Sequence, residues 1–88
     1  MHAVVATVQV DNYDEARKTL NERVVPMVSG QPGFVTGVWL APEDGKGNSV
    51  AVFETLEQAR NMADMVRQVA PSDVTVEDVS VREVAAQA

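Results

Sequence analysis

The chain lacks cysteine altogether and contains a single histidine, one tryptophan, one tyrosine and two phenylalanines. Without cysteine there is no disulfide, no thiolate nucleophile and no thiolate-ligated metal. No stretch approaches the roughly 20 consecutive apolar residues of a membrane span. The first residues also lack the basic segment and apolar run of a secretory signal. We therefore expect a protein of the reducing cytoplasm.

Basic residues are also scarce. Seven Lys and Arg stand against thirteen Asp and Glu, which gives a formal net charge of −6. Because such a surface repels phosphate groups, we expect neither nucleic acids nor membranes as partners. The sequence has no glycine-rich phosphate loop, no dinucleotide fingerprint, no Ser-His-acid grouping and no acidic residues at metal-ligand spacing. We expect no metal and no bound cofactor, and no motif marks a catalytic residue.

Apolar patterning divides the chain into the elements of one domain, residues 1–88. Strands are predicted where β-branched residues cluster, and helices where apolar residues recur every three or four positions. Asn12 with Glu15, and Thr55 with Gln58, have the spacing of capping boxes at helix starts. In chain order the prediction is a strand over 3–10, a helix from 12, strands over 34–40 and 49–53, a helix over 55–70 and a strand over 74–81.

Several residues interrupt these patterns. Pro26 removes a backbone donor within the first helix and predicts a kink or break near Val25. The valines of the last strand slip by one residue in their alternation, which predicts a β-bulge around Glu77 and Asp78. Turns or loops are predicted at residues 30–33, at the polar stretch 41–48 and at 70–73, where the second helix ends.

The order β-α-β-β-α-β, with right-handed crossovers, predicts an α+β ferredoxin-like sandwich. Its four-stranded antiparallel sheet carries both helices on one face. A swapped dimer of the same elements is the alternative. On the first strand Val4, Ala6, Val8 and Val10 are predicted to oppose Ala3, Val5, Thr7 and Gln9, and on the second strand Phe34, Val38 and Leu40 are predicted to oppose Val35, Trp39 and Ala41.

Both faces of this predicted sheet are apolar along most of their length. Because monomers rarely expose apolar patches of more than a few hundred Å², we expect a second copy of the chain to cover the outer face. The expected partner is therefore a homodimer formed by sheet-on-sheet packing. The alternative is that the valines reflect strand propensity on a solvated face. Trp39 or Phe53 on the outer face would speak against that alternative.

Two segments carry a resemblance to a known family. Residues 31–39, Gln-Pro-Gly-Phe-Val-Thr-Gly-Val-Trp, open the second strand, and residues 51–59, Ala-Val-Phe-Glu-Thr-Leu-Glu-Gln-Ala, lead into the second helix. Together with the order of elements, they resemble the dimeric α/β-barrel superfamily, most of all its antibiotic-biosynthesis-monooxygenase-type domains. The resemblance implies a homodimer whose sheets form a barrel, with a cleft between helices and sheet in each protomer. Some members oxidise aromatic polyketides without a bound cofactor, and others bind and degrade heme.

The heme-degrading members have an Asn on the first strand, a Trp at the end of the third strand and a His on the second helix. Here the first strand has no Asn, Phe53 stands at the Trp position and the second helix has no His. The resemblance therefore does not extend to heme degradation. For the cofactor-independent branch the chain offers Trp39, Tyr13, Asn48 and Arg60, none of which matches a catalytic position.

The candidates for lining a pocket are Trp39, Tyr13, Phe53, Met27, Met62 and His2. Trp39 is either a platform for a planar ligand or part of the core or dimer interface. The methionines line an adaptable pocket or fill the core. Tyr13 is a donor at the cleft mouth or a surface aromatic over the helix start, and His2 is a base or part of a frayed chain start. The helix arginines, Arg17, Arg60 and Arg67, are interpreted as solvated residues that pair along their helices.

Three functions remain open at this point. The first is a cofactor-independent monooxygenase that acts on a small aromatic or polyketide-like substrate in the cleft. The second is a non-catalytic dimeric module that binds an apolar metabolite. The third is a structural or interaction domain whose cleft is filled by its own side chains. Fold analogy does not choose between them, because the site decides function.

Overall fold

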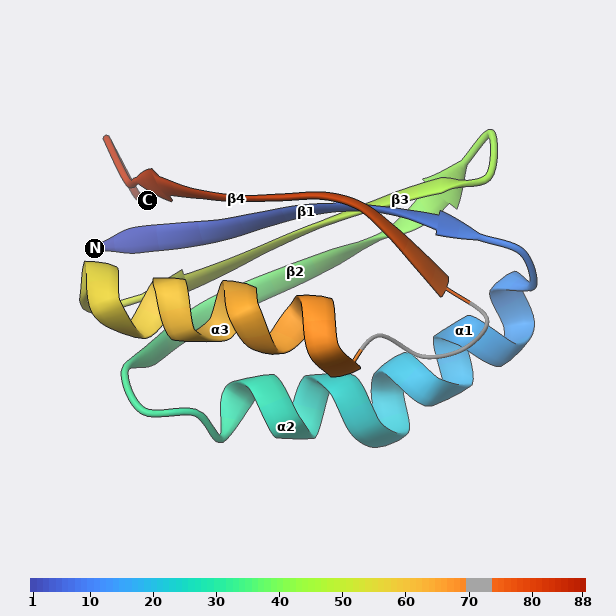
Figure 1. Ribbon diagram of the computed structural model, residues 1–88, viewed down its shortest axis with the longest axis horizontal. Coiled ribbons are helices and arrows are strands. Elements are labelled where there is room, and N and C mark those ends of the chain that lie inside the picture. Colours follow the sequence, from blue (N-terminus) through green and yellow to red (C-terminus); the bar gives the residue numbers. More distant parts are fainter. Residues whose placement is uncertain (70–73) are drawn as a thin grey trace.

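The computed structural model of the protein describes residues 1–69 and 74–88. All helices lie on one face of an antiparallel sheet whose strand order is β2-β3-β1-β4 (Figure 1). This arrangement is the ferredoxin-like sandwich that the sequence predicts. The strands are β1 (His2–Val10), β2 (Phe34–Glu43), β3 (Lys46–Phe53) and β4 (Val74–Glu83), and the helices are α1 (Tyr13–Thr19), α2 (Val25–Ser29) and α3 (Leu56–Val69).

The helical segment after β1 is interrupted where the sequence predicts a break. Asn12 caps α1, its side-chain oxygen accepting the backbone N–H three residues later at 3.3 Å. A π-helical turn, η1 (Leu20–Val24), follows α1, and the Val25 N–H donates to the Leu20 carbonyl. Pro26 then stands in the first turn of α2. Because proline has no N–H and crowds the carbonyl four residues earlier, the wider turn before it lets the helical path continue.

The connection between β2 and β3 is shorter than the predicted loop over 41–48. The strands run to Glu43 and from Lys46, so only Asp44 and Gly45 form the turn. Both have positive φ, 53° for Asp44 and 78° for Gly45. Positive φ at both positions is the geometry of the type I′ turn, which Asp-Gly favours in two-residue hairpins. The stretch is therefore the connection of a hairpin, and only its predicted extent over 41–48 is wrong, because the polar residues around the turn belong to the strands.

The second helix and the last strand follow the prediction more closely. Thr55 and Gln58 form a full capping box: the Gln58 N–H donates to Thr55 Oγ1 at 3.2 Å, and the Thr55 N–H donates to Gln58 Oε1 at 3.1 Å. The register between β1 and β4 shifts so that Glu77 has no partner, which confirms the predicted β-bulge. The predicted helix end at 70–73 and the side chain of Val69 lie outside the described residues.

The core lies between the helices and the inner face of the sheet. Phe53 lies at the centre of this core and is 0 % exposed. Its ring meets the ring of Phe34 edge-on, with the ring centroids 5.9 Å apart. From α3, Met62 and the small residues Ala59 and Ala63 pack against this pair. Because alanines keep α3 close to the sheet, this end of the helix–sheet interface is densely filled.

Phe34 and Trp39 share the inner face, which corrects the prediction that they lie on opposite faces. Both side chains come within 3.4 Å of where a Cβ on Gly37 would stand. The register between β2 and β3 shifts between Phe34 and Thr36, so Val35 is an extra residue on β2. Such an irregularity returns the side chains on its two sides to the same face. Val38, by contrast, lies on the outer face as predicted relative to Trp39.

The outer face of the sheet has an apolar centre. Val38, Val50 and Val5 lie opposite one another on β2, β3 and β1. Val38 is 53 % exposed and its neighbour Leu40 is 57 % exposed. Neither Trp39 nor Phe53 lies here, so the outer face lacks the large aromatics that would speak against a solvated sheet. Within residues 1–69 and 74–88, no helix is long and apolar enough to span a membrane.

Candidate ligand-binding cleft

A cavity of about 150 Å³ lies between the inner face of the sheet and the helices, at the end of the molecule where α1 begins. Alternate residues of β1, whose side chains point toward the helices, form its floor: Val4, Ala6, Val8 and Val10. Its other walls come from α1, η1, α2, α3 and the remaining strands. The cavity exists because these strand residues are small, whereas two phenylalanines fill the corresponding space at the other end.

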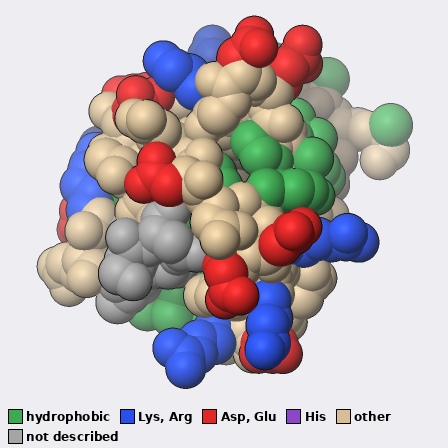
Figure 2. Space-filling view, turned by 90° about the vertical axis from the view of Figure 1, so that its right-hand side faces the viewer, with side chains coloured by type: hydrophobic (Ala, Val, Ile, Leu, Met, Phe, Trp, Pro, Cys, Tyr) green, Lys and Arg blue, Asp and Glu red, His purple; other side chains and the backbone are tan. Residues whose placement is uncertain are grey.

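A second hollow of about 270 Å³ adjoins the first, between the α1–η1 segment and β2. The residues that border both hollows are Tyr13, Arg17, Leu20, Trp39 and Leu40. The two hollows therefore form one cleft, apolar inside and with its mouth beside α1 and β2. Figure 2 looks at this end of the molecule and shows apolar side chains gathered in a patch that acidic and basic side chains surround.

Trp39 is half-buried and borders both hollows. It also packs against the buried core. A Cβ on Gly37 would come within 2.9 Å of the Trp39 ring, so glycine at that position lets the indole lie against the strand. Trp39 thus both packs against the core and borders the cleft.

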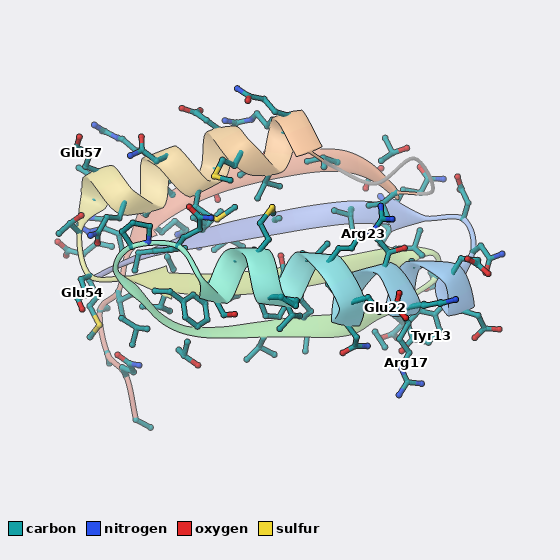
Figure 3. All side chains as sticks on the ribbon, turned by 90° about the horizontal axis from the view of Figure 1, so that it is seen from below. Tyr13, Arg17, Glu22, Arg23, Glu54 and Glu57 are labelled. Carbon is teal, nitrogen blue, oxygen red and sulfur yellow. The ribbon has the colours of Figure 1, made fainter. Side chains whose placement is uncertain are left out.

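Tyr13 and Arg17 stand one helical turn apart on α1, on the side that faces the cleft. Figure 3 shows the two side chains close together at this end of the molecule. Tyr13 is 41 % exposed. Arg17 is exposed, as the sequence predicts, and it also borders the cleft, which the sequence does not indicate. The signal that could have found Arg17 is its spacing of four from Tyr13 and three from Leu20, which both border the inner cavity.

The two candidate methionines border the inner cavity from different helices. Met27 comes from α2 and is half-buried, and Met62 comes from α3 and is 2 % exposed. Unbranched thioether side chains adapt their shape readily, so they can adjust to an occupant of the cavity. Met62 also belongs to the filled core, which places it at the boundary between the two regions.

Phe53 and His2 border neither hollow. Phe53 is a core residue, and its cross-strand partner on β1 is His2. His2 therefore lies at the end of the sheet opposite to α1, where its other cross-strand partner is Glu83. The Nδ1 atom of His2 is buried and makes no hydrogen bond among the described residues. The structure does not bring these two candidates together with the other four.

The remaining polar candidates contribute little to the cleft. Asn48 borders the inner cavity, but its Oδ1 accepts a hydrogen bond from Thr7 Oγ1 at 3.2 Å. Thr7 points to the outer face, so the main chain of Asn48 is the part that borders the cavity. Arg60 is exposed on α3 and borders neither hollow. Over the described ranges, no group of three or more His, Asp or Glu side chains is placed to hold a metal ion.

The sheet order and the helices on one face define a ferredoxin-like fold. Three solved structures share it. A candidate monooxygenase from Shewanella loihica PV-4 superimposes with a TM-score of 0.68 at 15% identity, over 98% of this chain and 95% of that one. SnoaB, a cofactor-independent oxygenase from Streptomyces nogalater, superimposes with a TM-score of 0.67 at 15% identity, over 98% of this chain and 94% of that one. The heme-degrader MhuD from Mycobacterium tuberculosis, with two hemes bound, superimposes with a TM-score of 0.59 at 17% identity, over 100% of this chain and 99% of that one.

No protein-family model and no curated protein sequence matches the chain. The structural likeness to these three proteins therefore establishes the fold. MhuD binds heme, so the side chains of this cleft can be compared with the usual ligands of heme iron. Heme iron is most often held by an imidazole or a thiolate, and among the described residues neither borders the cleft. The single histidine, His2, lies at the other end of the sheet.

Proposed function

We propose that the chain binds a small, flat and mainly apolar molecule in the cleft and oxidises it with molecular oxygen, as a cofactor-independent monooxygenase. The observation that carries the binding proposal is the pair of adjoining hollows, about 150 and 270 Å³, bordered by Trp39, Tyr13 and apolar side chains. Small-molecule sites are usually apolar with a few polar groups that fix orientation. The fold shared with SnoaB, a cofactor-independent oxygenase, supports the choice of reaction.

In this proposal the cleft orients the substrate and the substrate supplies the electrons. An activated CH₂ group becomes a carbonyl: one atom of O₂ ends in that carbonyl, and the other leaves as water with the two methylene hydrogens. The Trp39 ring would stack on the substrate, and the Tyr13 hydroxyl would donate to one of its oxygens. Apolar walls would exclude water from the reacting carbon.

A second candidate function is a module that binds such a compound without transforming it. One observation favours it: among the described residues that border the cleft, none is a carboxylate or an imidazole. These are the groups that most often act as general bases. A substrate of the proposed monooxygenase would therefore have to ionise through its own acidity. The third possibility, a cleft filled by its own side chains, is not favoured because the two hollows are present.

The test uses Trp39 as a reporter, because it is the only tryptophan of the chain. Anthrone, a flat tricyclic ketone with an activated CH₂ group, is titrated while Trp39 emission and dissolved oxygen are recorded. Saturable quenching with stoichiometric oxygen uptake supports the monooxygenase, and quenching without uptake supports the binding module. Absence of quenching by both anthrone and the smaller 2-naphthol would contradict both.

A variant pair ties the quenching to the cleft. Val8→Phe narrows the floor of the inner cavity and is expected to weaken binding at least tenfold. Gln9→Phe adds the same ring at the next position of β1, which points away from the cleft, and is expected to bind as the parent does. Equal binding by the two variants, both shown folded by circular dichroism, would place the ligand elsewhere.

We further propose that a second copy of the chain covers the outer face of the sheet. Val35, Val38, Leu40 and Val50 are 39–57 % exposed, and three of them lie on neighbouring outer positions of β2 and β3. Sheet-on-sheet packing would bury this patch. Light scattering at micromolar concentration should report twice 9.5 kDa. Val38→Lys should give a monomer. The control Thr75→Lys, on the polar β4 side of the sheet, should remain a dimer. A parent protein that scatters as a particle of 9.5 kDa would contradict the proposal.

A further inference from the structure

One charged side chain borders the cleft among the described residues, that of Arg17. It borders both the inner cavity and the outer hollow, so it stands where the two meet. The rest of the inner wall is almost entirely apolar, with Val8, Val10 and Met62 as examples. A ligand in the cleft would therefore have an apolar environment inside and a positively charged group at the mouth.

The Arg17 guanidinium has no carboxylate partner among the described residues. The ion pairs found there are Lys46 with Glu77, at 3.3 Å, and Arg67 with Asp64, at 3.7 Å. Arg17 shares this state with most of the basic residues of the chain, and it differs from them in bordering the cleft. Asp14, three positions before Arg17, is placed for helix pairing but does not pair with it. The side chain is exposed, so its guanidinium donors are open to solvent and to a group from outside the chain.

Tyr13 adds a second donor beside Arg17. The two residues are four positions apart on α1, which puts their side chains on the same side of the helix (Figure 3). A planar guanidinium with a neighbouring phenol hydroxyl matches the oxygens of an anionic group, because arginine presents its donors in a rigid fork. The net charge of −6 repels anions at long range. Salt screens that field over about 8 Å at physiological ionic strength, so the local contact decides.

From this placement we infer that the ligand of the cleft is an aromatic anion: a flat apolar body inserted toward Met62 and Trp39, with one carboxylate or phenolate oxygen group held at the mouth by Arg17 and Tyr13. The inference rests on the proposed binding function and names its ligand class. In its phenolate form the ligand also accounts for the missing base of the proposed reaction. A phenol that is conjugated with the reacting carbon and ionises beside Arg17 supplies electron density to that carbon without a carboxylate in the cleft, whereas a carboxylate ligand is held in the same way but is not activated by its charge.

The test compares three flat ligands of one size by calorimetry: 2-naphthoate, 2-naphthamide and 2-naphthol, the last on both sides of its own pKa. The acid and the amide differ in charge and hardly in shape. We expect 2-naphthoate to bind about tenfold more tightly than 2-naphthamide, a ratio worth about 1.4 kcal/mol. Tighter binding of 2-naphthol above its pKa would assign the phenolate, and preference for 2-naphthoate alone would assign the carboxylate.

Charge-matched variants assign the preference to Arg17. Arg17→Gln should abolish the tenfold preference, and Arg17→Lys should restore part of it, because a lysine keeps the charge without the fork. Arg60→Gln makes the same change of net charge on α3, away from the cleft, and should keep the full preference. Equal binding of acid and amide by the parent would overturn the inference while leaving the proposed function intact. Absence of binding by all three ligands would instead overturn the proposed function.

Discussion

The two ends of the helix–sheet interface are built from the same elements and differ in how they are filled. At the end where β1 starts, Phe34 and Phe53 meet edge-on beneath α3, and Phe53 is 0 % exposed. At the end where α1 begins, β1 offers Val8 and Val10, and a cavity of about 150 Å³ remains. The smaller side chains of β1 leave space at the α1 end, whereas two phenylalanines fill the interface at the other end.

The largest expected effect belongs to the filled end. Phe53→Ala should lower the free energy of unfolding by about 3–5 kcal/mol, because it removes a fully buried ring and leaves a cavity. Val8→Ala at the hollow end should cost about 1 kcal/mol, since it removes few methyl groups from a wall that already faces space. Urea denaturation measures both. Similar losses at the two positions would remove the contrast between the ends.

A smaller effect is expected where the two regions meet, at Gly37 beneath Trp39. A Cβ at Gly37 would lie 2.9 Å from the indole ring, so Gly37→Ala should cost about 1–3 kcal/mol through overpacking and shift Trp39 emission. In a Trp39→Leu background the added methyl group has room and should cost less than 1 kcal/mol. Equal costs in the two backgrounds would mean that the indole does not depend on Gly37.

The smallest effect on stability is expected from Pro26→Ala, which restores a backbone N–H after the π-helical turn. We expect a change in unfolding free energy within about 1 kcal/mol, together with backbone rearrangement in η1. Because Leu20 and Val24 of η1 border the cavity, the free energy of ligand binding should change more than the free energy of unfolding. Amide chemical shifts that stay unchanged over 13–24 would show that the proline does not maintain the π turn.

Local signals of the fold could be predicted from the sequence. The capping box of Thr55 and Gln58 could be predicted because its two residues lie three positions apart in the sequence. The slip in the valine alternation predicted the bulge at Glu77. The irregularity at Val35 could not be predicted, because the residues on both sides of it are apolar and either face accepts them. The bounds of the Asp44-Gly45 turn could not be predicted, because the polar residues on both sides of it belong to β2 and β3.

The candidate site was less predictable than the fold. Trp39, Tyr13, Met27 and Met62 border the cleft, because the helical and strand periods place them on inward faces. Phe53 shares such a face but lies beyond the cleft, and only the paired positions of the folded sheet reveal that. Arg17 has the sequence pattern of a solvated helix residue. What sets it apart is the hollow beside it, which depends on side-chain volumes from seven other elements.

The central claim is that the end of the molecule beginning with α1 is the ligand site and the opposite end is core. Amide chemical shifts measured during titration with 2-naphthoate test it most directly. We expect the largest changes at Val8, Val10, Tyr13 and Gly47, which border the cavity. We expect small changes at Ala59 and Ala63, which belong to the filled core. Saturable changes confined to Ala59, Ala63 and the outer face of the sheet, with the α1 end unaffected, would contradict it.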